Sequence, residues 1–215
     1  MKFPNSKILI FAKTPKIGFV KKRLIPLLGP EGALDFYKKC IKYTLVERCI
    51  SDLASVLIYV TSDGDLNFFP KILQDFPVSM HYQKGKDLGE RMYNATKKEL
   101  KNTDSIILIG TDAPALNNQD IEEAFIKLEN KDDIVMKPAE DGGYVLLGMK
   151  KTHKSLFVNI PWGTDSVAEI SRQRCKEKNI NLIELKESWD IDRPEDLKKA
   201  FKLESFNRFI NQASF

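Results

Sequence analysis

Histidine, cysteine and long apolar runs are all scarce in this 215-residue chain, and each scarcity excludes a class of protein. The three cysteines are odd in number and scattered, so neither a disulfide framework nor a cysteine metal site is expected. The only two histidines, His81 and His153, disfavour a histidine-driven hydrolase. No segment approaches the roughly 20 apolar residues that cross a bilayer, and the short apolar run near the start lacks a signal-peptide cleavage site. We therefore expect a soluble, cytoplasmic protein without a membrane span.

A strong excess of charge of either sign is also missing. The chain has 34 basic and 30 acidic residues, a formal net charge of +4, and no basic stripe with interleaved aromatic residues. This balance argues against a nucleic-acid partner and weakly favours a ligand that carries phosphate. It does not define the oligomeric state.

No linker, internal repeat or low-complexity stretch divides the chain. The length suits one hydrophobic core, so we expect a single domain over residues 1–215, with its core at about 7–200 and a C-terminal helical tail at 201–215. The tail is only weakly amphipathic from Lys202 onward, which predicts a loosely packed last helix.

Strand-like and helix-like patterns alternate along the chain. The strand-length apolar runs are 7–12, 54–61, 77–82, 105–110, 133–139, 143–149 and 181–186. Apolar residues recur every three or four positions in 31–50 and 118–129, as in helices. This alternation predicts an α/β fold with a mostly parallel central sheet and helices on both faces. The loop "EDGG" is too short for a parallel crossover, so the runs before and after it should be antiparallel or lie in different sheet regions.

Ligands of open parallel sheets bind at the carboxyl ends of the strands, so the residues that follow each strand are the first to consider. The first strand is followed by "FAKTPKIGFVKKRL", which includes Lys13, Gly18, Lys21 and Arg23. Cations and a glycine that lets backbone N–H groups approach suit a polyphosphate. The stretch is neither a Walker loop nor a dinucleotide fingerprint, and a lysine-rich surface turn is an equally good interpretation.

The third strand is followed by "QKGKDLGERM", which opens a helix. Asp87 or Gly89 fits the helix cap. The alternative is a binding role, with backbone groups facing a base or ribose and a cation near a phosphate. The candidates for that role are Gly85, Leu88, Gly89 and Arg91.

An aspartate follows the fourth strand, in "IILIGTDAP". Asp112 lies too far from the next helix to cap it, since Asn117 or Asn118 is better placed. It could organise the turn before Pro114. We favour a metal-binding role, because Mg²⁺ prefers one or two carboxylates together with phosphates of its ligand.

The late stretch "WDIDRPEDL" carries further carboxylates. Asp192 with Glu195 resembles a capping box, and Pro194 suits the first helical turn. Asp190 is left without a structural task. A ligand from this loop would complete the metal site that Asp112 begins.

Two remaining stretches, "PAEDGGYVLLG" and "IPWGTDSV", fit an acceptor pocket. The structural alternatives are a tight reversal at the glycines, a helix cap at Thr164 and a core position for Trp162. The candidate pocket residues are Glu140, Asp141, Gly142, Gly143, Tyr144, Trp162 and Asp165.

Taken together in their order along the chain, the six motifs resemble a bacterial family of GT-A-fold transferases labelled radical-SAM/selenodomain-associated transferase. That family is similar to phospholactate guanylyltransferase and, more distantly, to molybdenum-cofactor guanylyltransferase and the nucleotide-diphospho-sugar transferases. The resemblance covers about residues 7 to 200 and implies one Rossmann-like domain that binds a nucleotide with a divalent cation, Mg²⁺ or Mn²⁺. It implies that Lys21 and Arg23 contact phosphates, and that the metal is held by Asp112 with Asp192 as second ligand.

The chain departs from the family pattern at two positions. The family commonly has threonine where this chain has Lys22 and Arg193. The second departure removes the usual helix cap, so it predicts that Asp192 takes part in capping.

Metal and cationic side chains stabilise a departing phosphate without a protein nucleophile, which fits a site rich in Asp, Lys and Arg. Our first hypothesis is a nucleotidyltransferase that moves NMP from a nucleoside triphosphate to a phosphorylated or hydroxylated small-molecule acceptor. The second is a glycosyltransferase that uses a nucleotide-sugar. The third is a non-catalytic nucleotide-binding regulatory protein.

Overall fold

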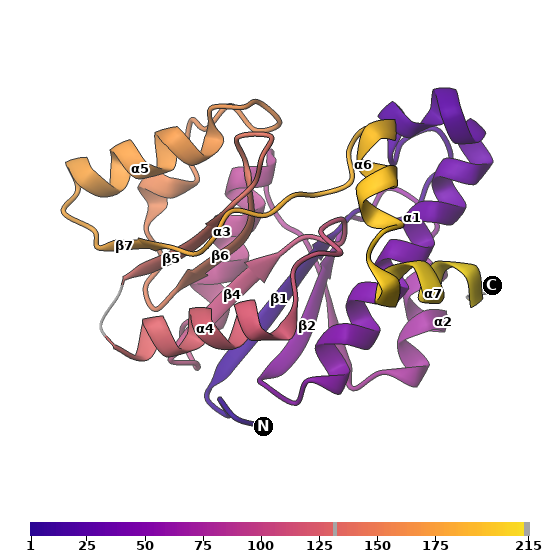
Figure 1. The fold of residues 1–215 in the computed structure, drawn as a ribbon. Coiled ribbons are helices and arrows are strands. Elements are labelled where there is room, and N and C mark those ends of the chain that lie inside the picture. The colour runs from indigo at the N-terminus through magenta and orange to yellow at the C-terminus, as the bar shows by residue number, and fades with distance from the viewer. Residues whose placement is uncertain (131–132, 213–215) are drawn as a thin grey trace.

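A seven-stranded sheet forms the centre of the protein (Figure 1), and the computed structural model describes residues 1–130 and 133–212. The strands are β1 (Ser6–Ala12), β2 (Ser55–Val60), β3 (Val78–Tyr82), β4 (Ser105–Ile109), β5 (Ile134–Pro138), β6 (Tyr144–Met149) and β7 (Leu182–Glu184). The helices are α1 (Ile25–Ile50), α2 (Phe68–Ile72), α3 (Leu88–Glu99), α4 (Asn118–Glu129), α5 (Val167–Glu177), α6 (Pro194–Ala200) and α7 (Glu204–Gln212). Short 3₁₀ turns are η1 (Lys22–Leu24), η2 (Leu73–Asp75) and η3 (Lys154–Leu156).

The sheet order is β3-β2-β1-β4-β6-β5-β7, and every pairing is parallel except the two that β6 makes. The predicted α/β fold with a mostly parallel sheet is therefore confirmed, as is the antiparallel pairing of the strands that "EDGG" connects. Six strands point their carboxyl ends to one edge of the sheet, and the amino end of β6 joins them there.

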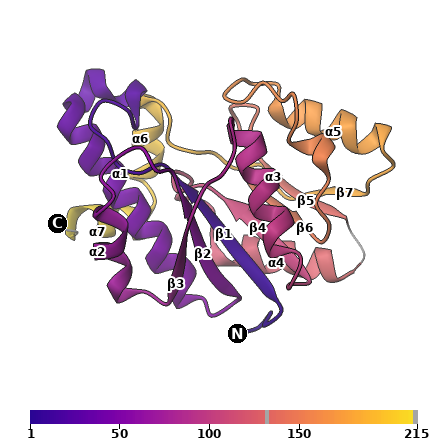
Figure 2. The same ribbon diagram turned by 180° about the vertical axis from the view of Figure 1, so that it is seen from behind.

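Helices cover both faces of the sheet, as Figures 1 and 2 show from opposite sides. On one face α1, α2 and α4 pack on apolar side chains of the central strands, and on the other face α3 and α5 do so. The continuous apolar runs of β1, β2 and β4 follow from this double burial, since each strand residue meets a covered face. No helix among the described residues combines the length and apolar character that a membrane crossing requires.

The first long helix is broken near its start. Gly29 adopts a φ of 70° and a ψ of 166°, and Pro30 follows it, so the regular part begins close to the predicted residue 31. The break turns the first helical segment toward the carboxyl edge of the sheet. It thereby connects the loop after β1 to the helix that covers the sheet.

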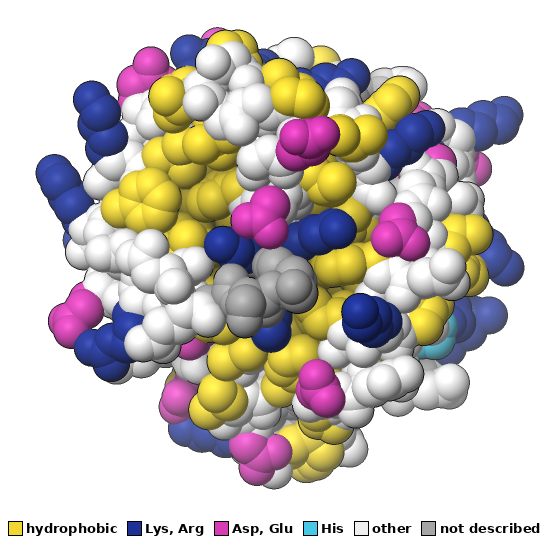
Figure 3. All heavy atoms as spheres, turned by 90° about the vertical axis from the view of Figure 1, so that its right-hand side faces the viewer, with side chains coloured by type: hydrophobic (Ala, Val, Ile, Leu, Met, Phe, Trp, Pro, Cys, Tyr) yellow, Lys and Arg dark blue, Asp and Glu magenta, His cyan; other side chains and the backbone are white. Residues whose placement is uncertain are grey.

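The C-terminal tail is better packed than the sequence pattern predicts, and α7 is clearly amphipathic, with Phe206 and Ile210 on its buried face. Phe206 of α7 is only 1% exposed, and its ring meets Tyr43 edge-to-face at a centroid distance of 5.0 Å. Together with α6, it forms a third apolar cluster on the outer side of α1. The prediction of a loosely packed last helix is therefore wrong, because that helix covers α1 instead of lying free on the surface. Figure 3 looks onto this side, where hydrophobic, basic and acidic side chains intermingle.

Phe206→Ala tests this packing. Removing a fully buried phenylalanine is expected to lower the free energy of unfolding by about 3–5 kcal/mol, as measured by urea denaturation. The matched control is Phe201→Ala, because Phe201 is 41% exposed and its loss is expected to lower that free energy by less than about 1 kcal/mol. Equal losses in the two variants would show that α7 is not part of the folded core.

Candidate functional site

The loop after β1 is tied to its neighbours by backbone hydrogen bonds. The Lys13 N–H donates to the Tyr37 hydroxyl (2.8 Å), and the same hydroxyl donates to the Lys13 carbonyl (3.0 Å). The Thr14 N–H donates to the Thr61 hydroxyl (2.9 Å). The basic loop, defined here as residues 13–23, thus rests on α1 and on the loop after β2.

Lysines of the basic loop point in different directions. Lys16 and Lys22 lie over the ring of exposed Phe19, at 4.1 and 5.4 Å from its centroid. Lys21 turns inward, where its side chain is only 6% exposed. Gly18 has a φ of 75°, which a glycine adopts without strain. The loop therefore presents cations both to solvent and to the edge of the sheet.

Asp112 lies at that edge, directly after β4, and Lys21 Nζ approaches its Oδ2 to 3.1 Å. Burial would lower the pKa of Lys21, but the neighbouring Asp112 carboxylate leaves that pKa raised, so the ammonium stays charged. The same Nζ donates to the Ile191 carbonyl. The structure thus joins the basic loop, the end of β4 and the segment before α6.

The segment between β7 and α6 crosses the carboxyl edge of the sheet (Figure 1) and brings Asp190 and Asp192 to it. The Ile191 N–H donates to the Asp112 carbonyl at 2.8 Å, which fixes this crossing. Burial, followed by the nearby charges of Asp112 and Asp141, raises the pKa of Asp190 to about 7. Asp192 forms an ion pair with Arg23. Asp112 and Asp192 thus both lie close enough to Asp190 for their charges to raise its pKa.

Asp192 does not cap α6. The Asp196 carboxylate accepts hydrogen bonds from the N–H groups of both Asp192 (3.0 Å) and Arg193 (2.7 Å). The acceptor of the α6 capping box is therefore Asp196, one residue after the predicted Glu195. Pro194 occupies the first helical position, as expected. The expectation that Asp192 and Glu195 form the capping box is wrong, because Asp196 at the third helical position supplies the acceptor.

The stretch after β3 and the basic loop both lie beside the loop that follows β2. Asp87 caps α3 by accepting the Glu90 N–H at 2.8 Å, and Arg91 Nε donates to the Gly85 carbonyl at 3.1 Å. The Thr61 hydroxyl, followed by the positive charges of Arg91 and Lys16, lowers the pKa of Asp63. Arg91 and Lys16 thus both lie close enough to Asp63 for their charges to act on it.

No sequence pattern assigns a role to the loop after β2, although this loop supports both candidate ligand-binding stretches. A Cβ atom on Gly64 would lie 2.8 Å from the Thr14 carbonyl oxygen, so only glycine lets the basic loop pass this closely. The signal that was available is the turn-rich sequence "SDGD" at 62–65.

Candidate acceptor residues form two contact groups. Tyr144 meets Trp162 edge-to-face at 6.3 Å, and a Cβ on Gly89 would lie 2.7 Å from Trp162 Nε1. The half-exposed Leu88 precedes that glycine at the start of α3. The Tyr144 hydroxyl is buried without a hydrogen-bond partner in the described part of the chain, and burial raises its pKa. This group therefore connects the predicted acceptor pocket to the stretch after β3.

The second contact group is the close approach of the loop between β5 and β6 to the loop before α5. Gly142 has a φ of 84°, and a Cβ there would lie 1.9 Å from the Asp165 carbonyl oxygen. Asp141 accepts the Gly143 N–H at 2.8 Å, which closes the turn. Thr164 does not cap α5, since its hydroxyl donates to the Pro161 carbonyl.

Glu140 is placed apart from the other candidates. Its carboxylate pairs with Lys199 of α6, and its N–H donates to the Ser188 carbonyl at 3.0 Å. This residue therefore connects the β5–β6 loop to the C-terminal segment. Its side chain does not join the Tyr144 and Trp162 group.

Within residues 1–130 and 133–212, no three His, Cys, Asp or Glu side chains are grouped closely enough to hold a metal ion by themselves. The donor set still suits a divalent ion that a nucleotide brings, since Mg²⁺ is usually bound by one or two carboxylates plus substrate phosphates. Asp112 is 41% exposed, and the Asp190 carboxyl makes no hydrogen bond with the described residues. These two are the residues that fit such an ion best.

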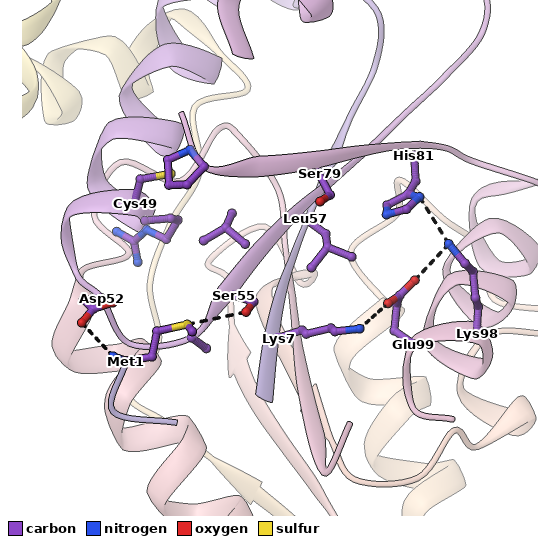
Figure 4. Close-up of a pocket in the computed structure, with 14 residues that line it drawn as sticks. Met1, Lys7, Cys49, Asp52, Ser55, Leu57, Ser79, His81, Lys98 and Glu99 are labelled. Atoms are coloured by element: carbon purple, nitrogen blue, oxygen red, sulfur yellow. Dashed lines mark hydrogen bonds and ion pairs between the residues drawn. The ribbon is translucent and has the colours of Figure 1, made fainter. Parts of the chain in front are cut away.

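A hollow of about 650 Å³ lies elsewhere, along the amino halves of β1 and β2, and Figure 4 shows its lining. Its charged groups are largely paired within the protein: Lys7 and Lys98 both approach Glu99, the N-terminal ammonium pairs with Asp52, and Arg48 donates to the Leu116 carbonyl. Burial would raise the pKa of Glu99, but hydrogen bonds from Lys7, Tyr59 and Lys98 lower it to about 2. This internal pairing makes the hollow a weaker candidate than the carboxyl edge, in spite of its size.

A family model described as "Uncharacterized protein conserved in bacteria (DUF2064)" matches residues 45–164, more than half of the chain. A comparison with curated proteins found no match. Among solved structures, a candidate nucleotide-diphospho-sugar transferase from Desulfovibrio desulfuricans G20 has a TM-score of 0.80 and 26% identity, covering 97% of this chain and 98% of that one.

More distant structures share the fold. A cytidylyltransferase from Leptospira borgpetersenii serovar Hardjo-bovis has a TM-score of 0.61 and 18% identity, covering 97% of this chain and 93% of that one. An inositol-1-phosphate CTP transferase from T. maritima has a TM-score of 0.56 and 14% identity, covering 99% and 98%. These two structures show a shared fold, and the 26% identical structure from Desulfovibrio desulfuricans G20 confirms the resemblance to the nucleotide-diphospho-sugar transferases drawn from the sequence motifs.

Gly142→Ala tests whether the close approach to Asp165 shapes the site. Both the clash and the positive φ oppose a side chain, so the free energy of unfolding is expected to fall by about 2–4 kcal/mol. Gly18→Ala is the matched control, because Gly18 has a similar φ but open space around it. Its expected loss is about 1 kcal/mol. A loss in Gly142→Ala no greater than in Gly18→Ala, both read from urea denaturation, would contradict the close approach.

Glu99→Gln tests the charge network of the hollow. The folded pKa of Glu99 is about 2, below its ordinary value of 4.5, so the carboxylate stabilises the fold above that ordinary value and loses this contribution as pH falls toward 2. The wild type is expected to be more stable than Glu99→Gln by about 2 kcal/mol near pH 6, with the gap narrowing between pH 4.5 and 3. Exposed Glu123→Gln serves as control, with an expected change below about 0.5 kcal/mol. A gap between wild type and Glu99→Gln that does not change with pH would contradict this assignment.

Proposed function

Because the chain belongs to the DUF2064 family, and because its candidate site joins a basic loop to a group of carboxylates, we propose that it is a nucleotidyltransferase. It moves NMP from a nucleoside triphosphate to a phosphorylated or hydroxylated small-molecule acceptor. The observation that carries this proposal is the Lys21–Asp112 contact at the carboxyl edge of the sheet.

This contact supports the proposal because it places opposite charges where a nucleotide needs both. Phosphate oxygens require cations, which Lys21, Arg23 and the exposed Lys13 and Lys16 supply. A divalent ion that travels with those phosphates requires carboxylates, and Asp112 with Asp190 provides them. The nucleotide would therefore lie with its phosphates between the basic loop and the acidic group.

The reaction needs no protein nucleophile. An acceptor oxygen attacks the α-phosphorus, the bond from that phosphorus to the α,β-bridging oxygen breaks, and pyrophosphate leaves. The acceptor proton passes to solvent, or is already absent when the acceptor is a phosphate. Lys21 and Arg23 stabilise the charge that develops on the departing pyrophosphate. A divalent ion held by Asp112 and Asp190 would add electrostatic stabilisation of the same charge.

The acceptor is proposed to bind beside Tyr144 and Trp162. Their edge-to-face contact lies next to Gly89, at the start of the stretch that is proposed to face the base or ribose. The buried Tyr144 hydroxyl lacks a partner among the described residues, and an acceptor oxygen would give it one.

A glycosyltransferase that uses a nucleotide-sugar is the second candidate. The observation in its favour is the TM-score of 0.80 to a candidate nucleotide-diphospho-sugar transferase that is 26% identical. The same phosphate and metal contacts would serve this reaction, in which a nucleoside diphosphate leaves. The two reactions differ in whether pyrophosphate or a nucleoside diphosphate is released.

Asp112→Asn tests the proposed role of the acidic group. With each nucleoside triphosphate, Mg²⁺ and a panel of phosphorylated and hydroxylated acceptors, the wild type is expected to release pyrophosphate. The variant is expected to lose on the order of 100-fold or more in kcat/KM. Asp52→Asn is the matched control, because Asp52 is an exposed aspartate at the opposite end of the sheet, and it should retain full activity.

Three outcomes decide between the hypotheses. Acceptor-dependent pyrophosphate release that fails in Asp112→Asn supports nucleotidyl transfer. Transfer from a nucleotide-sugar without pyrophosphate release from any triphosphate supports glycosyl transfer instead. Nucleotide binding that raises the melting temperature equally in the wild type and in Asp112→Asn, with no turnover, would indicate a non-catalytic binding protein.

A further inference from the structure

The Lys21 ammonium contacts Asp112, the carboxylate that the proposed divalent ion would use. Its Nζ lies 3.1 Å from Asp112 Oδ2 and also donates to the Ile191 carbonyl. The lysine side chain is 6% exposed, whereas Asp112 is 41% exposed. The Lys21 ammonium is thus surrounded by protein, while the Asp112 carboxylate stays open to solvent.

The backbone directs this one lysine inward. Lys21 adopts a left-handed conformation, with φ 45° and ψ 44°, which is uncommon for a residue that is not glycine. The next two residues, Lys22 and Arg23, are exposed. Such a backbone is retained only where the surroundings hold it, and here the ammonium contacts on Asp112 and Ile191 do so.

The Asp190 carboxyl gives the contrasting case. It is half-buried beside Asp112 and Asp141, and no hydrogen bond reaches it from the described residues. Among the described residues, Lys21 is the cation paired with Asp112, and Asp190 beside it forms no ion pair. The carboxylates of Asp112 and Asp190 have capacity for a second cation, but the Lys21 ammonium already contacts Asp112 Oδ2.

The geometry points to Lys21 as an internal counter-cation that competes with the divalent ion for Asp112 until a nucleotide arrives. This inference rests on the proposed function. In the nucleotide-free protein the ammonium neutralises Asp112 and keeps metal affinity low, because a second cation at the same carboxylate is repelled. Triphosphate oxygens then accept the ammonium, and the carboxylate is released to the ion that the nucleotide carries.

A purely structural lysine would behave in the opposite way. If Lys21 only joins the basic loop to β4 and to the segment before α6, its removal would loosen the carboxylates and weaken metal binding. Competition predicts tighter metal binding after the same change. The sign of the effect therefore separates the two roles.

The test is a titration of the nucleotide-free full-length protein with Mn²⁺. Binding is monitored by calorimetry and by the electron paramagnetic resonance signal of free Mn²⁺. Lys21→Met and Lys21→Gln are expected to bind Mn²⁺ at least 10-fold more tightly than the wild type. Lys22→Met is the matched control, because Lys22 is the adjacent lysine but lies over Phe19, and its affinity should equal that of the wild type. Unchanged or weaker binding in both Lys21 variants would overturn the inference.

A second measurement uses the unaltered protein and does not depend on how the variants fold. An amine-reactive reagent should label Lys21 slowly in the nucleotide-free state, and saturation with Mn²⁺ alone should raise the labelling rate several-fold, read by mass spectrometry. A labelling rate that stays constant while Mn²⁺ binds would overturn the competition. Neither measurement involves turnover. A negative result in both would therefore leave the nucleotidyltransferase proposal standing, and an absence of nucleotidyl transfer would not alter the Mn²⁺ binding or labelling results.

Discussion

The contact between Lys21 and Asp112 is the interaction on which the candidate site depends. It joins a loop that follows the first strand to a residue that ends the fourth, and through the Ile191 carbonyl it also reaches a segment near the C-terminus. These three segments are far apart in the sequence. A parallel sheet brings the first two to one edge, and the crossing segment before α6 covers them there.

The surrounding loops are held by close backbone approaches that only glycine permits. Gly64 lets the basic loop pass the loop after β2, and Gly142 lets the β5–β6 turn pass the loop before α5. Gly89 packs against the Phe157 carbonyl and Trp162, so its absence of a side chain serves loop packing, whether or not it also faces a nucleotide. The charges of the site are thus positioned by tightly packed backbone and not by long flexible side chains alone.

Much of the fold could be predicted from the sequence, because buried strands of a parallel sheet are continuous apolar runs and their helices repeat every three or four residues. The alternation of strand-like and helix-like patterns predicted where the strands lie, and the short loop "EDGG" excluded a parallel connection between β5 and β6. Their positions after predicted strands made Lys21, Asp112 and Asp190 candidate site residues. The packing of α7 could not be predicted, since it depends on Phe206 meeting Tyr43, two residues separated by α2 to α6. The shift of the α6 cap to Asp196 and the role of the loop after β2 also depend on neighbours that the sequence does not place.

The hollow beside Lys7 and Glu99 shows why size alone does not identify a site. Its volume is about 650 Å³, but Lys7 and Lys98 already pair with Glu99 there, whereas at the carboxyl edge Asp190 has no hydrogen bond with the described residues and Asp112 is open to solvent.

The most direct test of the account is a crystal structure of the protein with a non-hydrolysable nucleoside triphosphate and Mn²⁺, using the anomalous signal of manganese. The account predicts the manganese peak beside Asp112 and Asp190, with the triphosphate against residues 13–23. Nucleotide density in the hollow beside Lys7, or a manganese peak away from Asp112, would contradict it.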